Sequence, residues 1–274
     1  NVGANNSVLQ VWNAIDRKMV KQRADISTRQ ASRPHFDNKN RVYTAFDEYK
    51  IIRYNIADDK VEVIRENPDS VFLIIRAVAP SGKYLVFQQS NQLVLFDVAK
   101  KEEKALMSIP SVTPNAAYFD QSDQTLVVTM LKDDITELRV FDLHRAEPKP
   151  VFTKILNSSI KRPMFSESGK QIAFANQQGL HYVDYQQKKQ FEIKPPGLPY
   201  SFVGINKNGT ISAGNDDILD LFNENGERIK YTKLSKNLFF STNLTKILAQ
   251  DPNDMDYHSP DWTQEIVNAN PLSF

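Results

Sequence analysis

Histidines are the side chains of this chain best suited to bind a metal or transfer protons near neutral pH. There are four of them, at His35, His144, His181 and His258. No two stand at the i, i+2 or i, i+4 spacing that brings two imidazoles to one metal ion, and cysteine is absent. We therefore predict no metal site. We expect His181 to be a partly exposed or hydrogen-bonded structural residue and His144 to lie solvated in a hairpin tip.

Serine nucleophiles are the next candidates, and their usual sequence setting is missing. The chain has no Gly-x-Ser-x-Gly motif, and no local spacing assembles a Ser-His-Asp triad. Phosphate-binding loops are rich in glycine and lead into a helix, whereas this chain has nine glycines and no convincing helical pattern. The sequence thus predicts no catalytic residues and no cofactor.

Two arginines stand in the same short motif, Arg-Pro-x-Phe. The motif occurs as Arg33-Pro34-His35-Phe36 and as Arg162-Pro163-Met164-Phe165. Proline lacks an N–H donor and is tolerated as the first residue of a strand, so each motif is typical of a strand beginning. Guanidinium groups recognise carboxylates and phosphates, which makes Arg33 and Arg162 candidate contacts for an anionic ligand or an acidic partner side chain. The alternative is that both arginines face bulk solvent or pair with neighbouring aspartates.

The elements that would position these arginines are indicated by a repeat. Six short apolar runs end in an aromatic or branched residue followed by Asp or Asn, roughly 42 residues apart, which is the period of a four-stranded propeller blade. They are Val11-Trp12-Asn13, Arg53-Tyr54-Asn55, Leu95-Phe96-Asp97, Val140-Phe141-Asp142, Tyr182-Val183-Asp184 and Leu221-Phe222-Asn223.

Each repeat also predicts two hairpins. An inner hairpin is clearest from Phe165 to Phe174, where an apolar residue, a polar turn with Gly169 and alternating apolar residues follow one another. An outer hairpin contains the aromatic run, as from Leu219 to Tyr231, where Asn225-Gly226 predicts a type I′ turn. The fold class is therefore all-β, a six-bladed β-propeller of four-stranded antiparallel blades.

The hairpin count indicates how such a ring closes. The first outer hairpin, Val8 to Lys21, has no inner hairpin before it, and the last inner hairpin, Leu238 to Gln250, has no clear outer hairpin after it. We predict that the two chain ends share the last blade, which removes exposed sheet edges. A seven-bladed alternative places an outer strand near Trp262 to Val267. Residues 1–274 then form a single propeller domain, with 251–274 as an irregular C-terminal tail.

In a six-bladed ring the blades that carry Arg33 and Arg162 lie opposite each other. Innermost strands line the axial channel, so the two guanidinium groups could converge at one channel mouth. Like charges that face one another in a narrow channel are destabilising unless an anion or a carboxylate lies between them. This reasoning strengthens the hypothesis of an anionic ligand or acidic partner group there.

Composition limits the classes of partner. The chain has 34 Lys and Arg against 33 Asp and Glu, a formal net charge of +1, which indicates no nucleic-acid partner.

No 18 apolar residues run together, and no basic-then-apolar leader opens the chain, so we expect a soluble chain without membrane insertion whose export signal, if any, was removed. The absence of cysteine fits a reducing cytosol or an envelope protein that avoids misoxidation. We favour the bacterial periplasm, cell envelope or a secreted setting.

The hairpins carry a family resemblance. Phe165 to Phe174 and Ala79 to Phe87, each followed by a run that ends in Asp184 or Asp97, resemble the blades of TolB-like and WD-repeat propellers. The turns depart from the usual Ser-Pro-Asp-Gly, and no blade has the Gly-His dipeptide of WD repeats. The resemblance implies a scaffold that mediates protein-protein interaction.

Our functional prediction is accordingly a non-catalytic propeller that binds protein partners of unidentified kind. The alternative is a propeller hydrolase or lyase, or the substrate-gating propeller of a prolyl-oligopeptidase-like peptidase. Such peptidases have similar blades but carry their catalytic groups in a separate α/β-hydrolase domain.

Overall fold

The computed structural model describes residues 9–13, 17–26, 34–46, 49–67, 71–109, 114–145, 147–160, 162–206, 209–215, 217–233, 237–240 and 247–250. Within these ranges the regular secondary structure consists of β-strands, without a helix. The chain forms two compact units, residues 1–132 with 137–154 and residues 133–136 with 155–274. That residues 1–274 form one domain stays a prediction.

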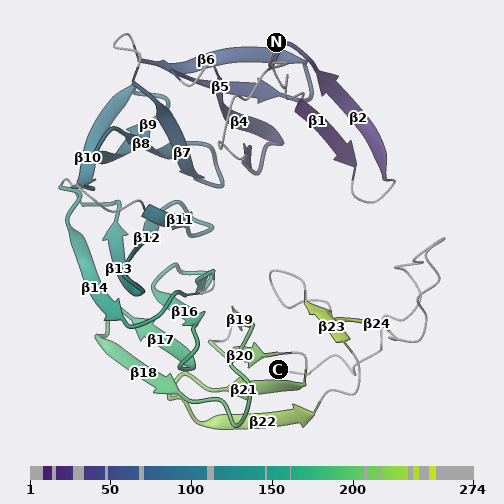
Figure 1. Cartoon of the computed structure of the whole chain (residues 1–274), viewed down its shortest axis with the longest axis vertical. Coiled ribbons are helices and arrows are strands. Elements are labelled where there is room, and N and C mark those ends of the chain that lie inside the picture. Colours follow the sequence, from purple (N-terminus) through teal and green to yellow (C-terminus); the bar gives the residue numbers. More distant parts are fainter. Residues whose placement is uncertain are drawn as a thin grey trace. The chain divides into compact units, whose positions relative to one another are not determined.

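The first unit contains a two-stranded hairpin and three four-stranded antiparallel sheets, whose strands follow one another in chain order (Figure 1). The hairpin is β1 (Leu9–Asn13) and β2 (Lys18–Arg23). The sheets are β3 (His35–Phe36), β4 (Arg41–Phe46), β5 (Lys50–Asn55) and β6 (Lys60–Glu66); β7 (Leu73–Val78), β8 (Tyr84–Gln89), β9 (Gln92–Asp97) and β10 (Glu102–Ser108); and β11 (Pro114–Phe119), β12 (Thr125–Lys132), β13 (Ile135–Asp142) and β14 (Pro150–Leu156). Residues 135–136 of β13 and 155–156 of β14 belong to the second unit.

The second unit repeats this plan with two four-stranded sheets and one hairpin. The sheets are β15 (Met164–Phe165), β16 (Gln171–Ala175), β17 (Leu180–Asp184) and β18 (Lys189–Ile193); and β19 (Phe202–Ile205), β20 (Ile211–Gly214), β21 (Ile218–Phe222) and β22 (Arg228–Lys233). The hairpin is β23 (Asn237–Phe240) and β24 (Ile247–Gln250). The outer hairpin predicted at the start of the chain is therefore observed as β1–β2, and the last predicted inner hairpin is observed as β23–β24.

Neighbouring sheets within a unit bury their apolar faces against each other. Tyr43 from β4 packs with Ile75 and Phe87 of the next sheet, and Ala77 packs with Ala117 of the sheet after that. The second unit has the same arrangement, with Tyr182 and Phe222 in one cluster between its two sheets. Burial of each large side chain stabilises the fold by about 1.5–3 kcal/mol, so the contacts between sheets are the main source of stability.

The inner-hairpin turns share a left-handed residue at the same position. Their fourth residue has a positive φ in every such turn of the four-stranded sheets, at Asn40 (56°), Gly82 (72°), Asp123 (60°), Gly169 (69°) and Gly209 (82°). The left-handed region favours glycine, and asparagine and aspartate tolerate it better than other residues. The polar turn predicted at Gly169 is confirmed, with the glycine in the left-handed region, and Asn40 and Asp123 occupy the equivalent position for the same reason.

The repeated Asp or Asn after the aromatic run closes the outer-hairpin turns. The side-chain oxygen of Asp97 accepts hydrogen bonds from the backbone N–H groups of Ala99 and Lys100, both at 3.1 Å. In the same way, the Asp184 carboxylate accepts hydrogen bonds from the backbone N–H groups of Gln186 and Gln187, at 3.0 and 2.8 Å. These bonds satisfy backbone donors that the tight turn leaves without a strand partner. The motif that reveals the repeat is thus explained by turn chemistry.

One turn differs from its prediction. Gly226 has a positive φ of 82°, but Asn225 is absent from the residues with positive φ, so the turn is not type I′. Instead the Asn223 side chain accepts hydrogen bonds from the N–H groups of Asn225 and Glu227, both at 2.9 Å. A four-residue turn with a single left-handed residue at its end therefore replaces the predicted two-residue turn.

The buried Tyr182 gives the fold a predictable response to alkali. Its ring is 1% exposed and stacks on Phe191 with centroids 4.7 Å apart. Burial, followed by the charges of Asp184 and Glu224, raises the pKa of Tyr182 to about 12. The unfolded pKa is about 10. The folded state therefore holds the Tyr182 proton more tightly than the unfolded state does. The contribution of this proton to the free energy of unfolding is complete below pH 10 and is lost as the pH rises toward 12.

We therefore expect Tyr182→Phe to unfold near the wild-type urea midpoint at pH 7 and to lose less stability than wild type at pH 11. Burial also raises the pKa values of Tyr43, Tyr54 and Tyr200, so part of the alkaline loss should remain in the variant. Urea titrations of both proteins at the two pH values measure the difference. Equal losses at pH 11 would contradict the assignment to Tyr182.

Several predictions fall beyond the described residues. The tail 251–274 and the alternative strand near residues 262–267 lie outside them. The hairpins β1–β2 and β23–β24 are both observed, and their union in one last blade stays a prediction. The described residues contain no helix that is long and apolar enough to cross a membrane.

Candidate functional site

The two arginines singled out in the sequence have different outcomes. Arg33 lies outside the described residues. Arg162 is exposed and precedes β15 in the second unit, with the buried Pro163 between it and the strand. The strand start predicted for this motif is confirmed, whereas the convergence of Arg33 and Arg162 on one anion stays a prediction.

The histidines show no arrangement for catalysis in the described part of the chain. His181 is fully buried on β17 rather than partly exposed, which corrects one of the two expectations for it. Its Nε2 lies 3.0 Å from the Asn176 side-chain oxygen, its Nδ1 lies 3.4 Å from a Glu192 carboxylate oxygen, and its ring stacks on Phe174. The expectation of a hydrogen-bonded structural histidine is confirmed. His144 is exposed as expected, and His258 lies outside the described residues.

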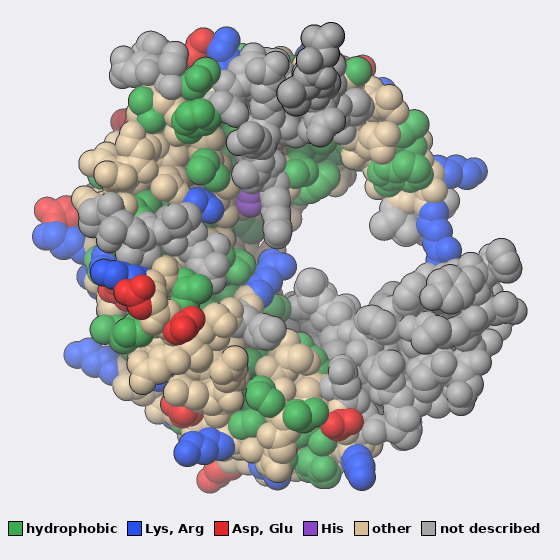
Figure 2. All heavy atoms as spheres, in the orientation of Figure 1, with side chains coloured by type: hydrophobic (Ala, Val, Ile, Leu, Met, Phe, Trp, Pro, Cys, Tyr) green, Lys and Arg blue, Asp and Glu red, His purple; other side chains and the backbone are tan. Residues whose placement is uncertain are grey.

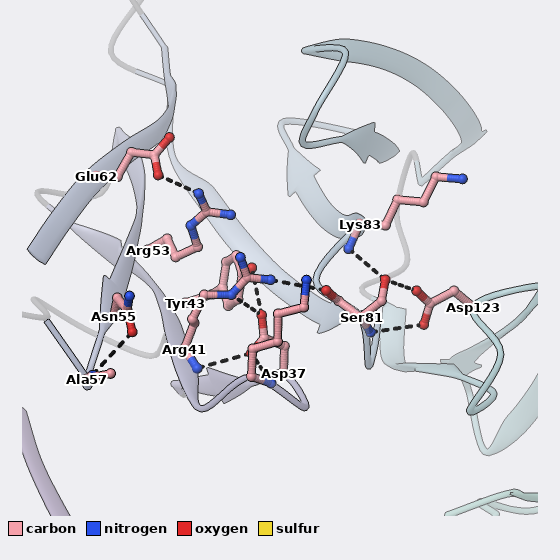
Figure 3. A network of polar contacts seen from close by, with 11 residues as sticks. Asp37, Arg41, Tyr43, Arg53, Asn55, Ala57, Glu62, Ser81, Lys83 and Asp123 are labelled. Atoms are coloured by element: carbon pink, nitrogen blue, oxygen red, sulfur yellow. Dashed lines mark hydrogen bonds and ion pairs between the residues drawn. The ribbon is translucent and has the colours of Figure 1, made fainter.

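An extended polar network of the first unit lies at its inner-hairpin turns. We call Asp37, Arg41, Tyr43, Ser81 and Asp123 the turn clasp (Figure 3). The Asp37 side chain is fully buried, and its Oδ2 accepts hydrogen bonds from Arg41 Nε at 2.6 Å and from the Tyr43 hydroxyl at 3.0 Å. Its Oδ1 accepts from the backbone N–H groups of Lys39 and Arg41 at 2.9 and 3.0 Å. Every lone-pair direction of this carboxylate is thus used within the protein.

The clasp joins three consecutive sheets. Arg41 Nη2 donates to the Ser81 carbonyl oxygen at 3.1 Å, which links the β3–β4 turn to the β7–β8 turn. The Ser81 backbone N–H and hydroxyl both donate to the Asp123 carboxylate in the β11–β12 turn, the first at 3.3 Å. Figure 3 shows these groups in a row from one turn to the next. The three turns are therefore held in fixed positions relative to one another.

A second arginine continues the network away from the turns. Arg53 Nη2 pairs with Glu62 at 2.5 Å on the outer strands of the same sheet. Burial raises the pKa of the Tyr43 hydroxyl, and a hydrogen bond with Arg53 opposes that rise. Tyr43 therefore stays protonated at neutral pH and can donate to Asp37. The clasp includes no imidazole to activate Ser81, so we interpret it as a structural network.

Charged groups elsewhere are paired or spread out. Figure 2 shows Lys or Arg side chains beside Asp or Glu side chains over the face in view, without a large area of one sign among the described residues. The described residues also contain no group of three or more His, Cys, Asp or Glu that could hold a metal ion.

An apolar surface stands out on the β1–β2 hairpin. We call Gln10, Trp12, Met19 and Gln22 the hairpin face. Trp12 and Met19 are register partners on the two strands and are 57% and 46% exposed. Gln10 and Gln22 also pair in register, and the Trp12 indole N–H donates to Gln10 at 3.4 Å. Large apolar side chains at the surface with amides beside them are typical of interaction sites.

The other face of this hairpin is anchored in the first unit. Leu9 is buried and packs with Ile52 and Tyr54 of the β3–β6 sheet. Arg23 at the end of β2 pairs with Asp59 in the β5–β6 turn at 3.1 Å. The hairpin face is therefore held on a packed support.

Neither the turn clasp nor the hairpin face was singled out by the sequence. The clasp residues look like ordinary turn residues, because Asp and Ser are common in such turns. Trp12 was noticed only as a member of the repeat.

No protein-family model matches the chain, and no curated protein matches its sequence. Solved structures do match. The Dos1 propeller aligns over 88% of this chain and 70% of its own, at 12% identity and a TM-score of 0.61. The β-propeller domain of Myceliophteria thermophila Cps50 (Swd1) aligns over 85% and 82%, at 14% identity and a TM-score of 0.51. A chain of the mitotic checkpoint complex aligns over 81% and 70%, at 15% identity and a TM-score of 0.55.

These likenesses concern the fold alone. Together with the four-stranded antiparallel sheets they confirm the predicted fold class, an all-β propeller. The resemblance to WD-repeat propellers is supported as a likeness of fold. The TolB-like side and the closure of the last blade stay predictions.

Proposed function

We propose that this protein is a non-catalytic propeller scaffold that binds protein partners, in a bacterial envelope or secreted assembly. The observation that carries the proposal is the hairpin face, where Trp12 is exposed beside its cross-strand partner Met19. Tryptophan and methionine are enriched in protein interfaces, and tryptophan is enriched among the residues that contribute most to binding.

The geometry of the face supports this role. Since Trp12 is 57% exposed, a partner that covers it removes about 85–140 Å² from water, worth about 2–3.5 kcal/mol before the costs of association are subtracted. The amides of Gln10 and Gln22 can hydrogen-bond a partner at the edge of the contact. Since Leu9 and Arg23 fix the hairpin to the next sheet, little ordering is needed on binding.

The structural neighbours are compatible with such a role. One of them belongs to a multi-protein assembly, the mitotic checkpoint complex. A propeller positions many loops and strand faces on one rigid body, which suits a scaffold.

The test is quantitative affinity capture from a lysate of the source organism. We expect the Trp12→Ser, Met19→Ser double variant to bind a partner that wild type captures at least about tenfold more weakly. The reason is that the binding free energy lost with the two buried side chains exceeds about 1.4 kcal/mol. The matched control is Ile155→Ser, Ile229→Ser, which removes two apolar side chains that are 67% and 60% exposed on other strands. Circular dichroism should show both variants folded. Equal capture by wild type and the hairpin-face variant would contradict the proposal.

A further inference from the structure

Arg76 is an arginine in the middle of an otherwise apolar strand. It lies in β7, the strand at the end of the β7–β10 sheet that pairs only with β8. The register of β7 against β8 shifts between Ile75 and Ala77, so Arg76 is the extra residue of a β-bulge. Bulges redirect a side chain and are frequent next to functional sites.

The bulge changes which way the strand faces. Before it, Ile75 packs with Phe87 in the cluster against the β3–β6 sheet. After it, Ala77 packs with Val86 and Ala117 in the cluster against the β11–β14 sheet. A regular strand would keep residues 75 and 77 on one face. Arg76 therefore stands where the strand switches faces, between two apolar clusters.

The guanidinium group is poorly compensated there. Its Nη2 donates to the side-chain oxygen of Gln88 at 2.5 Å, and its Nε is buried with no hydrogen-bond partner in the described structure. Burial lowers the pKa of this guanidinium, and among the described residues no acidic group opposes that shift. Buried donors without an acceptor are rare because each one destabilises the fold.

Other arginines of the same unit show the usual solution. Arg41 pairs with Asp37, Arg53 with Glu62, and Arg65 with Glu103. Each of these cations has a carboxylate from the protein. Arg76 has the neutral amide of Gln88 instead, so within the described residues this partly buried cation has no carboxylate partner.

We propose that Arg76 is a binding site for a carboxylate, carried either by a small molecule or by an acidic side chain of a partner. A carboxylate accepts two parallel hydrogen bonds from a guanidinium and supplies the missing negative charge. Because Nε is buried in this structure, binding turns the guanidinium away from Gln88 toward the ligand. This site differs from the hairpin face and does not depend on it.

The first experiment follows the arginine Nε–H groups by ¹H–¹⁵N NMR during titration. The probes are sodium acetate and a capped Glu-Asp dipeptide, each compared with sodium chloride at equal ionic strength. We expect one Nε–H resonance to shift saturably, to be missing in Arg76→Gln and to behave normally in Arg65→Gln. Tighter binding of the dipeptide by tenfold or more identifies a partner side chain as the source of the carboxylate, and equal binding identifies a small molecule. No saturable shift with either probe overturns the proposal.

The second experiment asks what Arg76 does without a ligand. Arg76→Met keeps a flexible apolar side chain of about the length of the arginine's aliphatic part and removes the uncompensated charge, so we expect its urea midpoint in ligand-free buffer to rise above wild type. Acetate should raise the wild-type midpoint and leave that of Arg76→Met unchanged. A variant that is less stable than wild type, or that fails to fold, would show that Arg76 has a structural role and would overturn the proposal.

Discussion

Replacement of Gly82 by alanine should destabilise the first unit by about 3–5 kcal/mol, a loss usual only for severe core or network defects. Gly82 has a φ of 72°, where a Cβ atom adds about 1–2 kcal/mol of backbone strain. The added Cβ would also overlap Arg41 Nη2 and the Asp37 carboxylate and lie 2.5 Å from the Tyr43 hydroxyl oxygen. The methyl group therefore enters the centre of the turn clasp. Since Asp37 is buried, its hydrogen bonds cannot be replaced readily by water.

The chain provides a matched control at the equivalent turn position. Gly209 has a φ of 82°, and its N–H closes the turn on Asn206 as that of Gly82 does on Ala79. A Cβ at Gly209 meets nothing within 4 Å. Gly209→Ala should thus show the backbone strain alone, about 1–2 kcal/mol. Urea unfolding followed by circular dichroism compares the two variants. Similar losses at the two glycines would show that the turn clasp contributes little to stability.

The two glycines also show how far the sequence predicts this structure. The polar turn between alternating apolar residues predicts a tight hairpin with a left-handed residue, because the backbone requirement is local. Gly82 and Gly209 meet that requirement in the same way. What surrounds each glycine is set by a neighbouring sheet, at contacts about 40 residues apart in the chain such as Arg41 with Ser81. A local pattern carries no information about such contacts.

The candidate sites were predictable to a smaller degree. Arg162 was found because its motif repeats that of Arg33, and the strand start after it was correct. Arg76 was missed because alignment of the repeats assumes regular strands, whereas a bulge inserts it into β7. His181 was expected to be partly exposed or hydrogen-bonded, and the second alternative is the one observed, since the residue is buried and its Nε2 lies 3.0 Å from the Asn176 side-chain oxygen. It lies on the third strand of its sheet, where Phe174 and Asn176 enclose the ring.

Asp220 in the second unit was also not foreseen, and its removal should have the second large effect. The residue is fully buried in the middle of β21, where a carboxylate is unusual. It accepts a hydrogen bond of 2.6 Å from the Tyr200 hydroxyl and forms an ion pair of 3.2 Å with Arg228 Nε. Asp220→Ala would leave the buried Tyr200 hydroxyl without its acceptor and open a cavity. We expect a loss of about 3–4 kcal/mol in the free energy of unfolding.

A double-mutant cycle with Tyr200→Phe separates the hydrogen bond from the cavity. Tyr200→Phe alone should destabilise by about 1–2 kcal/mol, because Asp220 loses a donor but keeps the Arg228 guanidinium. In the Asp220→Ala background the same change should be neutral or stabilising, since it removes a hydroxyl that no longer has an acceptor. Asp217→Ala, which removes an exposed carboxylate from the connection between β20 and β21, should change stability by less than about 0.5 kcal/mol. Strict additivity of the two buried substitutions in urea unfolding would mean that Asp220 and Tyr200 do not stabilise each other, because coupling between contacting residues is what the cycle measures.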